Sequence, residues 1–121
     1  MPRIDAAREA AMHLLNKWEL DEQPFEELLN EMDAKLSDGR DKRFARNLVL
    51  GVLRWRKRLD WMLSHFSKRP LDELDPGLLN ILRLGAYQTT FLDRVPDRAA
   101  VHTSVELAKR HGARSASGLI N

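Results

Sequence analysis

The segment from Leu78 to Leu92 is apolar around most of the circumference that it would have as an α-helix. A helix of that kind is buried among other elements, whereas a surface helix has one apolar stripe. Asp75-Pro76 precedes the segment, and an N-cap aspartate followed by proline is typical of a helix start. The sequence therefore predicts a central helix, which requires other helices around it. Its apolar residues are Leu78, Leu79, Ile81, Leu82, Leu84, Ala86, Phe91 and Leu92.

Four further segments carry apolar residues at intervals of three and four, the spacing that forms one stripe along a helix. They span 4–18, 25–36, 41–66 and 95–111, with proline or glycine at the breaks between them. Residues 41–66 fit one long helix or two helices joined at a kink near Arg56 to Arg58. Gly112 suits the C′ position of the fourth segment, and residues 115–121 resemble the beginning of another helix. No window alternates in polarity, so the predicted fold is all-α.

Length and composition favour a single domain over residues 1–121. The chain has 121 residues, of which 43% are hydrophobic, enough for one continuous core. No apolar run reaches the roughly 18 to 20 residues that cross a bilayer, and the N-terminus lacks the apolar region of a signal peptide. We therefore expect a cytoplasmic protein with no membrane partner. The absence of cysteine excludes disulfides and thiolate metal sites.

No arrangement of residues in the sequence indicates catalysis. The six glycines form neither of the common phosphate-binding or dinucleotide-binding motifs. The four histidines are scattered, and no serine lies in a nucleophile motif. The acidic clusters at 26–27 and 72–75 are explained as charges at helix ends. We therefore assign no catalytic residue, no metal and no cofactor to this chain.

The net charge of +2 conceals a basic middle third. Residues 1–39 carry four basic and ten acidic side chains, residues 40–69 carry ten and two, and residues 70–121 carry six and six. Opposite the apolar stripe, Arg43, Arg54 and either Lys57 or Arg58 share one helical face. Such a row can neutralise consecutive phosphates and release counterions. The candidate RNA-binding residues are Arg40, Lys42, Arg43, Arg46, Arg54, Lys57 and Arg58.

The alternative is a solvated face, some of whose cations pair with acidic residues of the first third, for example Glu26, Glu27 or Glu31. Charge alone does not decide between the two interpretations. Aromatic residues do not decide either, because Trp18, Phe44, Trp55 and Phe66 fall on core stripes. Trp61 lies close to the basic face and could stack on a base or pack against a neighbouring helix.

Gly51 and Gly85 lie inside predicted helices, where glycine costs roughly 1 kcal/mol relative to alanine. The compensation that we expect is close approach of two helices.

Several stretches together resemble a known family. Leu48-Val49-Leu50-Gly51-Val52-Leu53-Arg54-Trp55 and the following Leu59-Asp60-Trp61 resemble a segment of RsmB-type 16S rRNA cytosine-5 methyltransferases. Other stretches resemble the segment that these enzymes share with the antitermination factor NusB. They are Ile81-Leu82-Arg83-Leu84-Gly85-Ala86-Tyr87-Gln88, Val95-Pro96, Ala99-Ala100, Val105-Glu106-Leu107-Ala108-Lys109 and Gly118-Leu119-Ile120-Asn121.

The resemblance implies a NusB-like bundle of about six to seven helices in two antiparallel sub-bundles, and a role in binding RNA. NusB has an arginine-rich N-terminus, whereas this chain keeps only Arg3 and Arg8 there and has its basic charge near Trp55. We therefore expect the non-catalytic N-terminal domain of an rRNA methyltransferase, which helps to position 16S rRNA. S-adenosylmethionine and the cysteine nucleophile would belong to a C-terminal methyltransferase domain absent from this chain.

Two alternatives stay open. The chain could be an antitermination factor that binds boxA RNA together with a ribosomal protein of the small subunit. It could also be a domain that docks on its own catalytic domain and contacts RNA little or not at all.

Overall fold

The structure is a computed structural model that describes residues 6–20, 23–92 and 102–107. Within these ranges the chain is helical and contains no β-strand, which confirms the all-α prediction. A short helix at 102–107 follows α5. The other elements are α1 (Ala6–Glu19), α2 (Phe25–Lys35), α3 (Gly39–Arg54), α4 (Arg56–Ser64), the 3-10 turn η1 (Leu71–Glu73) and α5 (Pro76–Phe91).

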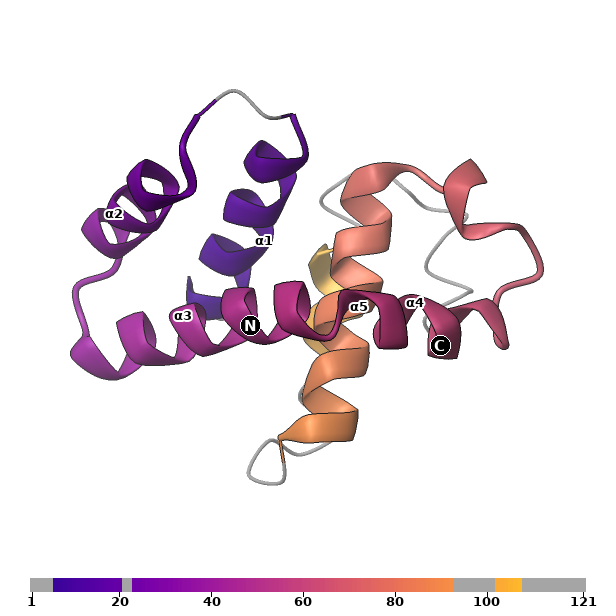
Figure 1. Cartoon of the computed structure of the whole chain (residues 1–121). Helices are drawn as coiled ribbons and strands as arrows, with labels where there is room; N and C mark the ends of the chain where they lie inside the picture. Colours follow the sequence, from indigo (N-terminus) through magenta and orange to yellow (C-terminus); the bar gives the residue numbers. More distant parts are fainter. Residues whose placement is uncertain (1–5, 21–22, 93–101, 108–121) are drawn as a thin grey trace.

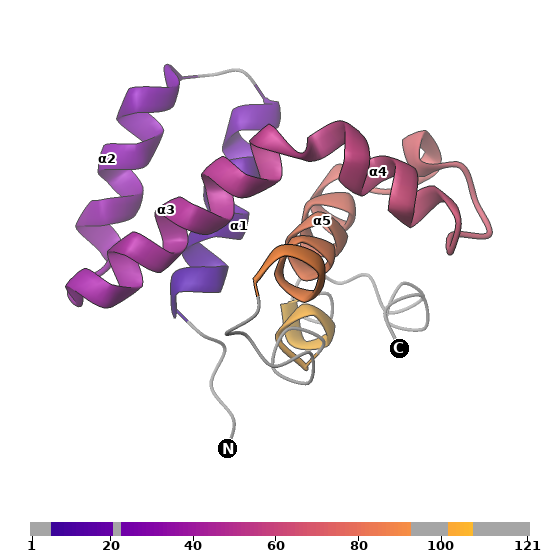
Figure 2. The same cartoon turned by 60° about the horizontal axis from the view of Figure 1, so that its bottom comes forward.

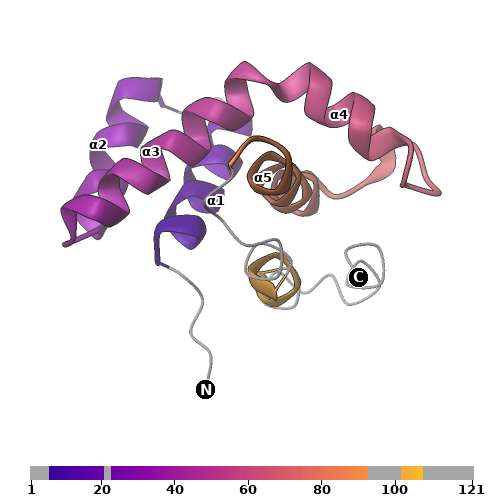
Figure 3. The same ribbon diagram turned by 90° about the horizontal axis from the view of Figure 1, so that it is seen from below.

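The helices form two groups that meet along α5. Helices α1, α2 and α3 form the first group, and α4, which continues from α3 across α5, forms the second together with η1 (Figure 1). Turned by 60°, the molecule shows α3 and α4 as a bent rod that crosses over α5 (Figure 2). Seen from below, 102–107 lies on the side of α5 opposite to this rod (Figure 3). The arrangement agrees with the expected two groups of helices.

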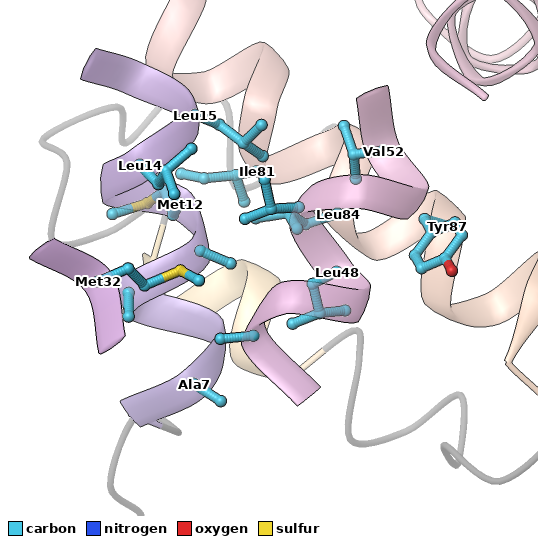
Figure 4. Close-up of a cluster of buried hydrophobic side chains, with 14 of the residues drawn as sticks. Ala7, Met12, Leu14, Leu15, Met32, Leu48, Val52, Ile81, Leu84 and Tyr87 are labelled. Atoms are coloured by element: carbon cyan, nitrogen blue, oxygen red, sulfur yellow. The ribbon is translucent and has the colours of Figure 1, made fainter. Parts of the chain in front are cut away.

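Helix α5 occupies the centre, as its all-round apolar sequence predicts. Ile81 and Leu84 lie between α1, which contributes Leu15, and α3, which contributes Leu48 and Val52 (Figure 4). The side chains of Ile81 and Leu48 are fully buried. Because each of the two groups covers a different side of α5, this helix exposes little apolar surface to water.

Local capping sets two of the helix starts. The Asp75 carboxylate accepts a hydrogen bond from the Leu78 backbone N–H at 3.1 Å, with Pro76 in the first turn, as predicted. Asp38 caps α3 in the same way, accepting from the Arg40 N–H at 2.8 Å. Helix α3 therefore begins at Gly39, two residues earlier than its apolar stripe suggested.

Some predictions fall outside the described residues or need correction. The helix start at Val95-Pro96, the C′ role of Gly112 and the helix at 115–121 lie outside the described ranges. Phe66, assigned to the core, is 84% exposed because α4 ends at Ser64 and the chain turns away. No helix in the described ranges is both long enough and apolar enough to span a bilayer.

Gly51 lies where α3 packs closely against α5. A Cβ atom at this position would overlap the ring of Tyr87. Tyr87 is held there because its hydroxyl donates a hydrogen bond of 2.7 Å to the Asn47 side-chain oxygen. At Gly85 a Cβ would lie 2.8 Å from the Ser104 hydroxyl oxygen. Both glycines therefore permit close helix packing, as the sequence predicts.

We expect Gly51→Ala to lower the free energy of unfolding by about 1 to 2 kcal/mol, because overpacking costs more than the improved helix propensity returns. Urea denaturation measures the change. Gly39→Ala is the control, since its Cβ would meet only the flexible Arg43 side chain at 3.5 Å. Equal stabilities of the two variants would contradict this account of Gly51.

Arg83 links three helices from inside the protein. Its side chain is 5% exposed and donates two hydrogen bonds to the Asp60 carboxylate of α4, at 2.7 and 2.9 Å. A third nitrogen donates to Asn80 at 3.0 Å and contacts Glu19 of α1 at 3.4 Å. A buried charge is tolerated only when it is paired and hydrogen-bonded. The guanidinium of Arg83 therefore fixes α4 and the end of α1 relative to α5.

Asp60→Asn should lower the free energy of unfolding by about 3 kcal/mol, because it leaves the buried guanidinium with an incomplete set of partners. Chemical denaturation at neutral pH tests this. The exposed Asp72 supplies the control, and Asp72→Asn should change stability by less than about 0.5 kcal/mol. If Asp60→Asn lowered the free energy of unfolding no more than the control does, the ion pair would not be what holds α4.

Candidate nucleic-acid interface

The basic middle third lies on α3, on α4 and at the junction between them. The helix axis bends at Trp55, whose φ and ψ angles are −103° and 16°. Hydrogen bonding continues on both sides, since the Trp55 N–H donates to Gly51 at 3.0 Å and the Leu59 N–H donates to Trp55 at 2.8 Å. The structure thus has the two joined helices of the predicted alternatives, with the kink one residue before the predicted range.

A hollow of about 430 Å³ opens at this junction. We call it the hinge hollow, and it is lined by Leu53, Arg54, Trp55, Arg56, Lys57 and Arg58. No acidic residue occurs between Asp41 and Asp60 in the sequence. Asp60 itself turns inward to Arg83. The hinge hollow therefore has four cationic side chains and no carboxylate in its wall.

The predicted RNA-binding residues separate into two clusters. Arg54, Lys57 and Arg58 gather around the hinge hollow, and all three are exposed. Arg54 is eleven residues after Arg43 along α3, which corresponds to a distance of about 16 Å along the helix axis. The cluster in the first two turns of α3 is thus distant from the hinge. Its members are Arg40, Lys42, Arg43 and Arg46.

Two cations of the basic third form ion pairs with the acidic first third. Arg46 contacts Asp33 of α2 at 2.6 Å, and Arg56 contacts Glu19 of α1 at 2.6 Å. The alternative in which basic residues pair with the acidic first third is therefore correct for these two side chains. Their acidic partners are not the predicted Glu26, Glu27 or Glu31. Arg40, Lys42, Arg43, Arg54, Lys57 and Arg58 form no ion pair with any described residue.

Aromatic rings pack against the junction of α3 and α4. Trp55 stacks on Phe91 with ring centroids 4.9 Å apart and an interplanar angle of 17°. The Arg54 guanidinium lies 5.5 Å from the centre of the Trp55 ring, a cation–π contact. Burial raises the pKa of the Tyr87 hydroxyl, and the nearby charge of Arg54 opposes that rise. Trp55 therefore packs against the core, as predicted, and also lines the hinge hollow.

The sequence did not single out Arg56 and Trp55 as site residues. Arg56 belongs to the basic block, and its place in the hollow depends on the bend of the helix, which brings residues 53–58 around one depression. Arg8, one of the two arginines near the N-terminus, is buried and donates to the Gln88 side-chain oxygen at 2.6 Å. Among the described residues, no group of histidine, aspartate and glutamate could hold a metal ion.

The pair between Arg46 and Asp33 has a consequence for pH dependence. Hydrogen bonding from Arg46 holds the pKa of Asp33 below its ordinary value. The pair therefore stabilises the fold above the ordinary aspartate pKa of about 3.9, and this contribution disappears as the pH falls through the lowered value. We expect Asp33→Asn to be less stable than the wild type at pH 7, with a difference that shrinks in acid. Denaturation across this pH range measures the difference. A difference independent of pH would contradict the role of the pair.

Comparisons with known proteins give a family and a fold. The NusB family matches residues 5–121. Transcription antitermination protein NusB of Shewanella piezotolerans is 34% identical over 116 residues, which cover 95% of this chain and 86% of that protein. A chain in the crystal structure of antitermination factors NusB and NusE with dsRNA superposes with a TM-score of 0.84 at 23% identity. That match covers 96% of this chain and 88% of the other. The likeness of the two structures supports the fold.

The expectation of a parent methyltransferase is wrong. A probable ribosomal RNA small subunit methyltransferase B of Synechocystis is 42% identical over 81 residues, but this chain spans only 18% of its length. The antitermination proteins instead match along most of both chains. The motifs that suggested the enzyme have structural roles here, since Gly51 packs on Tyr87 and Asp60 binds Arg83. In this chain both residues hold helices together.

Proposed function

The chain belongs to the NusB family, and we propose that it binds RNA as a transcription antitermination factor. The observation that carries this proposal is the match to antitermination proteins over 95% of this chain and 86% of the relative. The exposed cations at the hinge hollow suit an RNA backbone, because each neutralised phosphate releases counterions. Binding of this kind is non-catalytic and takes place in the cytoplasm, where transcription occurs.

The proposed contact surface is centred on the hinge hollow. Arg54, Lys57 and Arg58 are exposed there and form no ion pair with a described residue. Arg46 and Arg56 are less available, because each is committed to a carboxylate. Arg40, Lys42 and Arg43 could extend the contact along α3 if the RNA follows the bent rod of the two helices.

The proposed partners are boxA-type RNA and a ribosomal protein of the small subunit. The likeness to a NusB chain crystallised with NusE and dsRNA supports an assembly of protein and RNA. In such an assembly this chain would serve as an adaptor that joins the two. We propose no methyltransferase domain as a partner.

The test is the affinity of the protein for an RNA oligonucleotide carrying a boxA-type sequence, measured over a range of salt concentrations. We expect Arg54→Glu and Arg58→Glu each to weaken binding and to flatten the plot of log affinity against log salt. The slope should fall by about one unit for each phosphate that the variant no longer neutralises.

Lys35→Glu is the matched control, because it makes the same change of charge on α2, at the opposite end of the molecule from α4 (Figure 1). It should leave the slope unchanged. Equal effects of the three variants would show a response to net charge alone and would contradict the hinge as the contact. Wild-type binding that does not depend on salt would contradict the proposed backbone contact.

A further inference from the structure

Trp61 is the exposed aromatic residue nearest the hinge in the sequence, and RNA binding through cations alone does not explain it. Its side chain is 65% exposed. Among described rings it contacts only His65, which lies one turn later, with centroids 4.4 Å apart. The predicted alternative of packing against a neighbouring helix therefore receives no support from its ring contacts. The ring is available to a ligand.

The interior of the protein fixes the direction of this ring. Leu59 is fully buried in the core, and Asp60 is held inward by Arg83. Residues in a helix are spaced by about 100°, so Trp61 lies about 200° around the axis from Leu59. Because these two neighbours hold one side of α4 against α5, Trp61 points outward, away from the core.

Trp61 shares its face of α4 with cations of the hinge hollow. Lys57 and Arg58 precede it by four and three residues, the spacings that place side chains on one face of a helix. Both cations are exposed and line the hinge hollow. The face thus presents positive charge followed by an open indole ring. Single-stranded nucleic acid is bound by this combination, in which cations track the backbone and aromatic rings stack on bases.

We propose that Trp61 stacks on an unpaired base of the RNA whose phosphates contact Lys57 and Arg58, so that this surface prefers single-stranded RNA to duplex. The inference rests on the proposed RNA-binding function and adds the structural state of the RNA. Charge favours RNA over an apolar protein partner, because the exposed residues three or four positions from Trp61 are Lys57, Arg58, Ser64 and His65, none of which is apolar.

The experiment compares two probes, a single-stranded RNA of about 12 nucleotides and the same RNA annealed to its complement. Wild-type protein should bind the single strand more tightly than the duplex. Trp61→Ala should weaken binding of the single strand by about 5- to 100-fold, with little effect on duplex. The salt slope should stay unchanged, because an indole ring neutralises no phosphate.

Two further variants separate stacking from other causes. Trp61→Phe keeps an aromatic face and should retain most of the affinity, whereas Trp61→Leu keeps apolar surface and should behave like Trp61→Ala. Single-stranded RNA should also quench tryptophan fluorescence in the wild type more than in Trp61→Phe, in which the other two tryptophans report alone.

Salt-dependent RNA binding that is unaffected in Trp61→Ala would overturn this inference and leave the proposed function standing. Equal decreases in affinity for single strand and duplex, or full affinity in Trp61→Leu, would overturn it as well. A wild-type protein that binds neither RNA would overturn the proposed function and the inference together.

Discussion

The position of α4 depends on one buried guanidinium. Arg83 is almost fully removed from water, and its charge is acceptable only because Asp60 and Glu19 supply carboxylates. These two residues come from different helices, α1 and α4, so the ion pairs connect both helices to α5. Apolar contacts are non-directional, whereas a pair of hydrogen bonds from one guanidinium to one carboxylate sets an orientation.

The same network determines which cations remain available on the surface. Glu19 contacts both Arg83 and Arg56, and Asp33 is engaged by Arg46. The acidic first third therefore neutralises particular cations of the basic third and leaves others open. A chain with a net charge of only +2 can in this way carry a strongly positive surface at the hinge hollow. The location of this positive surface follows from the folding of α1 and α2 against α3.

The features that could be predicted from the sequence are those with local causes. The centrality of α5 follows from its composition, and the Asp75 cap follows from residues three positions apart. Ion-pair partners could not be predicted, because Glu19 and Arg83 are 64 residues apart and their meeting depends on the packing of the whole bundle. The exposure of Phe66 was missed for a related reason, since apolar periodicity continues past the residue at which α4 ends.

The erroneous attribution to a methyltransferase has a physical explanation in the difference between interior and surface residues. The two stretches that suggested the enzyme contain Gly51 and Asp60, through which helices meet, and also the exposed Arg54 and Trp61. The choice of the enzyme over NusB rested on surface charge, because the basic residues lie near Trp55 and few lie at the N-terminus. Any protein that uses this fold has to solve the same packing problem, whatever its activity. In the proposed function, RNA contact would instead depend on outward residues interspersed with them, such as Arg54 and Trp61, which the interior residues hold in place. A resemblance in the packing residues therefore identifies the fold, and the surface that they position has to be tested by itself.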